Sequence, residues 1–201
     1  MGRRGKKVIR QAVDLCVAAA AFVLAGMMLW HYVLSAPCRV ETDCRGQGVE
    51  AEMLQQWQQR ETGEALGITG MAGWRTQEWQ TVTSVSTGRQ QRTELIGVYG
   101  DMELVMPSKI LDGRYGLDAD IDYCVLSQGL AGHLFGSPEV TGECVKVGKE
   151  RYIVAGVVEN QEDIMMIPVK DGQVERIALS FDSRMGAEEK MRQVMEELGV
   201  R

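Results

Sequence analysis

The chain has 201 residues, enough for one ordinary domain and a short additional segment. Hydrophobic residues make up 45% of it, which excludes a chain that stays disordered for want of apolar side chains. The net charge of −6 is unevenly distributed: the first ten residues hold five basic side chains, whereas the part beyond Leu34 holds 17 Lys and Arg against 27 Asp and Glu, a net charge of −10. Such an acidic domain repels a phosphate backbone, so we expect no nucleic-acid partner.

A membrane anchor is predicted near the N-terminus. Residues 15–34 are almost entirely apolar, and a helix of about 20 apolar residues spans the hydrocarbon core. Trp30 and Tyr32 lie at its outer end, where amphipathic rings prefer the interface. Because residues 1–14 form a basic tail, the positive-inside rule places them in the cytoplasm and the remainder of the chain outside. A cleaved signal peptide is the alternative, but its apolar region spans only ~7–15 residues, so an uncleaved, single-pass signal anchor is expected.

Residues 35–66 are predicted to form a polar connector followed by one helix. In the second half of this segment, apolar side chains recur at spacings of three and four, which is typical of an amphipathic helix. They are Val49, Met53, Leu54 and Trp57. Gly63 closes the run, so we expect a helix over residues 49–60 that rises from the membrane.

The main domain is expected over residues 67–201 and to begin with two strands joined by a tight turn. Residues 67–73 are rich in glycine and are interpreted as a soft entry segment. Residues 74–86 alternate and are rich in Thr, Val and Trp, which favours a strand. The chain then turns at Gly88 and returns as a second strand over residues 92–99.

The next segment, residues 101–122, is predicted to be rich in loops, with a short helical piece near residues 108–111. Its last part carries three carboxylates at alternate positions, Asp118, Asp120 and Asp122. A calcium loop of the EF-hand type would need Gly at its sixth position and Glu at its twelfth, where this chain has Tyr123 and Gly129. We therefore expect a solvated acidic loop that holds no metal.

The centre of the domain reads as a strand, a short helix and a hairpin. Residues 124–126 form an apolar run long enough for a buried strand. Ser127 can cap the following helix and Gly136 can end it in a left-handed conformation. One face of that helix carries Leu130, His133 and Leu134. Residues 144–147 and 152–155 then flank a Gly-Lys turn, which predicts a β-hairpin.

The C-terminal part is predicted to hold a strand over residues 163–169, a second strand over residues 174–181 that pairs back with it, and a helix over residues 187–198. One face of this helix is apolar and consists of Met191, Val194, Met195 and Leu198. Strands closed by a helix indicate a small layered domain, and the fold class expected is α+β.

The central residues also carry a family resemblance. The stretches are Val125-Leu-Ser, Leu130-Ala-Gly-His-Leu-Phe-Gly, Gly142-Glu-Cys-Val-Lys-Val-Gly and Tyr152-Ile-Val-Ala-Gly-Val, preceded by Leu95-Ile-Gly-Val-Tyr-Gly and Ile110-Leu-Asp-Gly-Arg. In this order they resemble the MacB-like periplasmic core domain, the extracytoplasmic domain of ABC-type permeases of the MacB and FtsX class. The resemblance covers roughly residues 67–198 and implies a mixed α/β extracytoplasmic domain after a single N-terminal transmembrane helix.

Four cysteines lie in the part expected outside the membrane: Cys38, Cys44, Cys124 and Cys144. An even number in an oxidising space indicates disulfides, and three pairings are open. Cys38 with Cys44 would close a small loop above the membrane. Cys124 with Cys144, the favoured pairing, would join two strands that the motif order makes neighbours. A metal site would need ligands at closer spacing and a nearby His, so none is expected.

No catalytic constellation is visible, and we expect neither an enzyme nor a cofactor. His133 is the only His of the outer domain, and a triad would need Ser127 and Asp122 to meet it in space. Trp74 and Trp79 suggest a ligand-stacking pair, but aromatic residues in strands more often serve core or cross-strand packing. The sequence has no G-x-x-x-x-G-K-[ST] loop and hence no nucleotide-binding motif of its own.

The resemblance therefore implies a non-catalytic, membrane-anchored component related to ABC transporter permeases, acting in export or mechanotransmission. Permeases of that class carry further membrane helices after the outer domain, whereas this sequence shows no second apolar span of membrane length. The expected partners are an ABC ATPase and multi-span permease subunits, or a second copy of the chain through small residues around Gly26. The alternative function is a free-standing anchored sensor or binding module without an ATPase.

Overall fold

The computed structural model describes residues 22–58, 65–116 and 122–200. Within them the named helices are α2 (Ala51–Gln58), α4 (Met102–Val105), α5 (Gln128–Phe135) and α6 (Ala187–Glu197). The strands are β1 (Cys38–Asp43), β2 (Ile68–Ser84), β3 (Gln90–Gly100), β4 (Ile110–Gly113), β5 (Tyr123–Ser127), β6 (Cys144–Val147), β7 (Glu150–Val158), β8 (Ile164–Pro168) and β9 (Arg176–Phe181). The mixed α/β architecture agrees with the fold class expected from the sequence.

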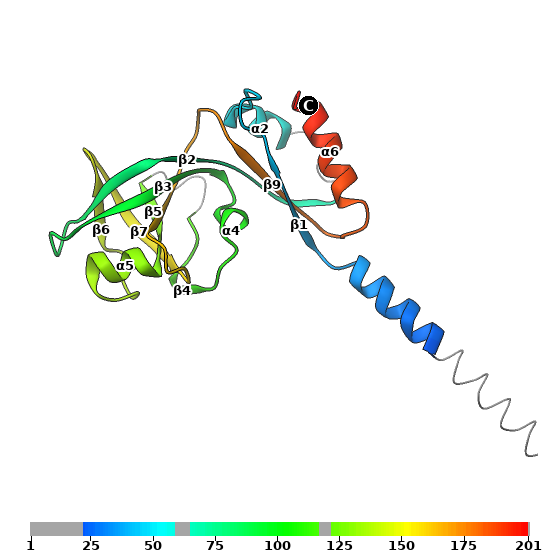
Figure 1. Cartoon of the computed structure of the whole chain (residues 1–201), viewed down its shortest axis with the longest axis horizontal. Helices are drawn as coiled ribbons and strands as arrows, with labels where there is room; N and C mark the ends of the chain where they lie inside the picture. Colours follow the sequence, from blue (N-terminus) through cyan, green and yellow to red (C-terminus); the bar gives the residue numbers. More distant parts are fainter. Residues whose placement is uncertain (1–21, 59–64, 117–121, 201) are drawn as a thin grey trace, which may run out of the picture.

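All nine strands belong to one sheet, which divides into two lobes that share strand β2 (Figure 1). The strand order is β1-β9-β2-β3-β8-β5-β7-β4, and β6 pairs with both β2 and β7. The pairing therefore closes on itself through β2, β3, β8, β5, β7 and β6, which makes a small barrel from the second half of β2. The first half of β2 pairs instead with β9, and β9 pairs with the edge strand β1.

The barrel is filled by one apolar cluster, and α5 closes one of its ends. The cluster contains strand residues from the six barrel strands together with Leu130, Ala131 and Leu134 of α5. Helix α5 starts where predicted, because Ser127 accepts a hydrogen bond from the Leu130 N–H, and it ends at Gly136, whose φ of 85° is left-handed. A short helix can thus pack its apolar face across the end of the barrel.

The second lobe is a three-stranded layer covered by two helices. Helices α2 and α6 contribute Leu54, Trp57, Met191 and Val194 to a core that also holds Ile177, Leu179 and Phe181 of β9. The Trp57 indole N–H donates to Glu197 Oε2 at 2.8 Å, which ties the two helices together. All four residues predicted on the apolar face of α6 are buried, which confirms that prediction.

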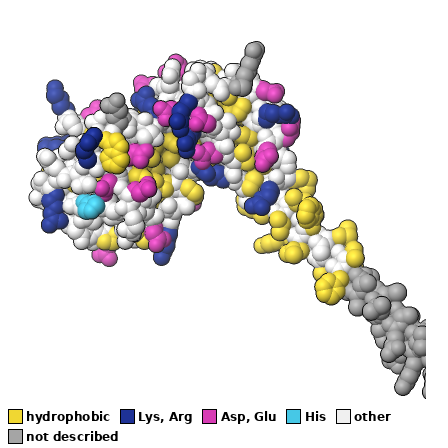
Figure 2. Space-filling model, in the orientation of Figure 1, with side chains coloured by type: hydrophobic (Ala, Val, Ile, Leu, Met, Phe, Trp, Pro, Cys, Tyr) yellow, Lys and Arg dark blue, Asp and Glu magenta, His cyan; other side chains and the backbone are white. Residues whose placement is uncertain are grey.

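Residues 22–34 form a helix that projects away from the sheet (Figure 1). Its large apolar side chains are exposed, among them Phe22, Trp30 and Tyr32, and they form the yellow stalk in Figure 2. Within the described ranges of the chain, no helix has both the length and the apolar character needed to cross a membrane. Residues 15–21 of the predicted anchor lie outside those ranges.

Three elements differ from the sequence-based predictions. The predicted connector contains β1, whose exposure alternates and whose outward residues are charged, so it reads as polar although it is an edge strand. The short helix expected near residues 108–111 is wrong: these residues enter β4, and the helix lies earlier, at α4. Strand β2 begins at Ile68, within the glycine-rich segment interpreted as a soft entry.

The predicted pairing of the last two strands is also wrong. Strand β9 does not pair with β8; the two lie on either side of the β2–β3 pair, with β8 parallel to β3 and β9 antiparallel to β2. The connection over residues 169–175 therefore crosses the face of β2 and β3. Gly97 allows this crossing, because a Cβ there would lie 3.0 Å from the Val169 side chain.

Candidate functional site

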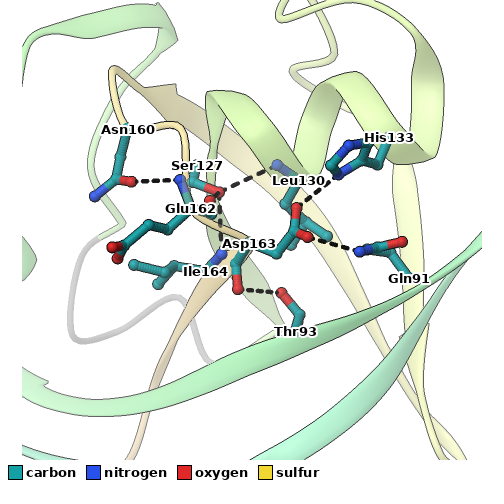
Figure 3. Close-up of polar contacts among 9 residues, drawn as sticks. All are labelled: Gln91, Thr93, Ser127, Leu130, His133, Asn160, Glu162, Asp163 and Ile164. Atoms are coloured by element: carbon teal, nitrogen blue, oxygen red, sulfur yellow. Dashed lines mark hydrogen bonds and ion pairs between the residues drawn. The ribbon is translucent and has the colours of Figure 1, made fainter.

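A cluster of polar side chains centred on Asp163 fastens α5 to the barrel (Figure 3). Asp163 Oδ1 lies 2.8 Å from His133 Nδ1 on α5, and Gln91 Nε2 on β3 donates to Asp163 Oδ2 at 2.6 Å. The Thr93 hydroxyl donates to the Asp163 carbonyl at 2.8 Å. One residue of the β7–β8 connection thus holds both a helix and a strand in place.

Ser127 forms the second half of this cluster, and all of its hydrogen-bonding capacity is used (Figure 3). Its hydroxyl donates to the Glu162 carbonyl at 2.6 Å and accepts from the N–H groups of Leu130 at 3.2 Å and Ile164 at 3.0 Å. The side chain is 1% exposed. A hydroxyl in this state has neither a free lone pair nor access to a substrate, so it positions backbone and does not attack.

The catalytic arrangement weighed for His133 therefore does not assemble among the described residues. Its acid is Asp163 and not Asp122, and the Ser127 hydroxyl is bonded to main-chain groups. The His133 side chain is 59% exposed while that of Asp163 is 16% exposed, so the pair lies at the surface of the cluster. An exposed pair of this kind contributes ~0–1 kcal/mol to stability.

The structure also describes part of the tryptophan pair and of the aspartate motif that were considered from the sequence. Trp74 is buried, with the Arg39 guanidinium 6.0 Å from its ring centroid, which confirms packing. Trp79 is 55% exposed and lies within the β-bulge between Gln77 and Gln80, so it is not a core residue. Asp118 and Asp120 lie outside the described residues. In the described ranges no group of three or more His, Cys, Asp and Glu could hold a metal ion.

The four cysteines expected outside the membrane are free thiols in the structure. Cys38 begins β1 and Cys44 directly follows its last residue, so six steps along extended chain separate their Cα atoms by ~20 Å. A disulfide needs Cα atoms ~4–7 Å apart, so this pairing would require β1 to unfold.

Cys124 and Cys144 are brought near one another, but on strands that are not neighbours. Both β5 and β6 flank β7, with Cys124 opposite Val154 and Cys144 opposite Ile153. Adjacent residues of a strand point to opposite faces, so the register directs the two thiols to opposite sides of the sheet. Burial raises the pKa of the Cys124 thiol, and Cys144 raises it further. The pairing stays a prediction, which mass analysis of non-reduced peptides from membrane-derived protein would test.

A groove lies in the second lobe, between β1 and α6. Its volume is about 620 Å³. The floor is apolar and is formed by Val40, Met191, Met195 and Val200. The rim carries four carboxylates, Glu41, Asp43, Glu188 and Glu196, and one guanidinium, that of Arg192. Among the described residues, β1 pairs only with β9, so its other edge is available to a partner strand.

Sequence reasoning missed this groove although it identified half of it. The Met191 and Met195 stripe predicts the buried face of α6, but the opposite wall is β1, which was read as connector. The alternation of Val40 with Arg39 and Glu41 was the available signal.

Comparison with known proteins gives the family. The sequence model described as MacB-like periplasmic core domain matches residues 16–198. No curated protein matches the chain. Among solved structures, the periplasmic region of MacB from Actinobacillus actinomycetemcomitans is similar with a TM-score of 0.61 and 13% identity, covering 84% of this chain and 86% of that one.

The extracellular domain of the noncanonic ABC-type transporter YknZ from Gram-positive bacteria is similar with a TM-score of 0.58 and 15% identity, covering 82% of this chain and 96% of that one. Identities this low show a shared fold alone. The match of the family model over most of the chain carries the assignment, and the shared fold agrees with it. The chain belongs to the MacB-like periplasmic core domain family.

Proposed function

We propose that this protein is a membrane-anchored, non-catalytic component of an ABC-type export or mechanotransmission assembly, and that its outer domain binds a partner protein. The observation that carries the proposal is the family match over residues 16–198, because it includes both lobes and most of the apolar N-terminal segment. The saturated Ser127 hydroxyl supports a role without catalysis.

The proposed anchor is residues 15–34, with residues 1–14 in the cytoplasm and both lobes outside. The exposed apolar side chains along residues 22–34 support it, since such a surface is unfavourable in water. A thiol reagent that cannot cross membranes should label a Lys149→Cys variant in intact cells, because Lys149 lies at the exposed β6–β7 turn. A Lys6→Cys variant should be labelled only after permeabilisation. The reverse pattern would invert the topology.

The β1–α6 groove is the proposed partner surface, and its occupant is an extended, basic segment of a partner protein that adds to the edge of β1. Glu41 and Asp43 are already paired with Arg39 and Arg45. Further negative charge comes from α6, where Glu188 forms no ion pair among the described residues and Glu196 interacts electrostatically with Arg192. An apolar floor with a negative rim favours a segment that combines apolar and basic side chains.

The deciding experiment is mild cross-linking of the tagged full chain in its own membranes, followed by mass spectrometry of what is recovered. An ABC ATPase or a multi-span permease recovered above a control membrane protein supports the assembly. Recovery of the chain alone contradicts it and favours a self-associating, anchored binding module.

The surface has its own test in the same assay. The double variant Glu188→Lys and Glu196→Lys should reduce partner recovery several-fold, because it reverses the charge of the rim. The matched control, Glu139→Lys with Glu159→Lys, makes the same change of charge at exposed positions outside the groove and should leave recovery unchanged. Equal loss in both variants would show that net charge matters and the groove does not.

A further inference from the structure

The barrel has one closed end and one open end. Helix α5 covers the end where β5 finishes and β8 begins. At the other end, where β7 begins and β8 finishes, a hollow of about 520 Å³ opens to solvent. Its apolar wall includes Leu95, Val147 and Ile167, and Gln77 and Gln80 of β2 supply amide groups at the side. Mouths of β-barrels are frequent positions for small-molecule sites.

Charges of both signs line this mouth: Glu150 and Asp171 are acidic, and Lys170 is basic. On the β7 side, the Tyr152 hydroxyl donates to Glu150 Oε2 at 2.5 Å, so one carboxylate oxygen already has a donor. On the side of the 169–175 connection, Lys170 borders the hollow, with the exposed Asp171 beside it. A ligand that enters the mouth would therefore be oriented by charge as well as by shape.

Arg75 packs against the 169–175 connection, outside the lining of the hollow itself, and forms no ion pair among the described residues. It is two residues before Gln77 on the same face of β2, and its cross-strand neighbour Gly97 has no side chain to cover it. Its guanidinium lies against the backbone of Gly172, where a Cβ would be 2.8 Å from Nη1. The Nε atom is buried and has no hydrogen-bond partner, and the side chain forms no ion pair within the described ranges.

A guanidinium in this position indicates a missing anion. Buried polar groups are nearly always hydrogen-bonded, and removing a cation from water without a partner costs free energy. Carboxylates are well matched to it, because two oxygens can accept from the planar fork of an arginine. The connection over residues 169–175, which crosses β2 and β3 in Figure 1, carries both Gly172, against which Arg75 lies, and Lys170, which borders the hollow.

We propose that the mouth of the barrel binds an amphipathic carboxylate: the carboxylate pairs with Arg75, with Lys170 nearby, and the apolar chain lies against Leu95, Val147 and Ile167. Both a fatty acid and the C-terminus of an apolar peptide have this chemistry. Glu150 disfavours the reverse orientation, because it would repel a carboxylate on the far side. This site is separate from the β1–α6 groove and does not depend on the proposed partner.

The test uses calorimetric titration of the full chain in lipid nanodiscs, with empty nanodiscs as the blank. The probes are octanoate, octylamine, and an N-acetylated Ala-Leu-Leu peptide with either a free or an amidated C-terminus. Binding of octanoate or of the free-acid peptide, together with weaker or no binding of octylamine and the amide, supports the proposal. Binding of octanoate points to a lipid-derived ligand, and binding of the free-acid peptide points to a peptide C-terminus. Equal binding of acid and amide, or no binding of either acid at millimolar concentration, would overturn it.

Two variants locate the site. Arg75→Gln should weaken carboxylate binding by about tenfold or more, because it removes a charge-assisted pair. It should leave the melting temperature of the empty protein unchanged or higher, since it removes an Nε atom that is buried without a hydrogen-bond partner. The matched control, Arg151→Gln, changes the same residue type on the outer face of β7 and should bind like wild type. A lowered melting temperature with unchanged binding would assign Arg75 a structural role and refute the site.

Discussion

Replacing Ser127 by alanine should destabilise the protein by about 2–4 kcal/mol. The substitution removes the cap of α5, which is worth ~1 kcal/mol. It also leaves the buried Ile164 N–H without its acceptor, and an unsatisfied buried donor costs ~1–3 kcal/mol. The Glu162 carbonyl loses its 2.6 Å donor as well. Because α5 closes the barrel, the loss acts on the whole lobe and not on one helix end.

The assay is urea unfolding of the full chain in mild detergent, followed by tryptophan fluorescence, since Trp57 and Trp74 are buried. The control is Ser137→Ala, which removes a single exposed hydrogen bond of 3.1 Å to the Glu139 N–H and should cost less than about 0.5 kcal/mol. A loss below ~1 kcal/mol for Ser127→Ala, with an unchanged dependence on urea, would refute the view that this hydroxyl holds the β8 entry and the α5 start together.

Three further outcomes are expected. Hydrogen bonds from Thr141 and Val140 lower the pKa of Asp112. The stabilisation of the fold by this carboxylate is therefore present above the pKa of the unfolded chain and is lost as pH falls through the folded pKa. Replacing Asp112 by asparagine should accordingly reduce the loss of stability below about pH 4, measured by urea unfolding at a series of pH values. Burial, with a smaller effect of Asp43, raises the pKa of Cys44 to about 11. In the reduced protein at pH 8, iodoacetamide should therefore label this thiol only after denaturation. Rapid labelling of the folded protein would contradict its burial. His133→Ala should cost less than about 1 kcal/mol by the same urea assay and leave partner recovery intact, because the ring is mostly exposed; loss of a measurable activity would revive the enzyme hypothesis.

The sequence predicted local structure well where caps and periodicity act within a few residues. Ser127 and Gly136 define α5, and the methionine stripe defines the buried face of α6, because these signals are local. Prediction from the sequence failed where contacts between residues far apart in the chain determine the structure. The glycine-rich start of β2 is a strand because Gly73 leaves room for Leu54, whose Cδ1 would lie 2.4 Å from an added Cβ.

The same limit applies to the sites. The pairing of His133 with Asp163 joins residues 30 positions apart, whereas the triad considered from the sequence used Asp122 as its acid. The position of Arg75 depends on residues 169–175 crossing over two strands, whereas the sequence predicted that the strands before and after this segment pair with each other. Topology of this kind is set by the whole core, so no window of residues reveals it.

Strand β2 has 17 residues and belongs to both lobes, so neither lobe has a complete wall without it. A pull transmitted from residues 22–34 enters the sheet through β1, reaches β9, and from there is carried along one continuous strand into the barrel. Strand β2 thus connects the lobe next to residues 22–34 with the barrel, which is the more distant lobe. Movement at the base is therefore expected to reach the barrel wall directly, through the pairing of β2 with β3 on both sides of the bulge between Gln77 and Gln80.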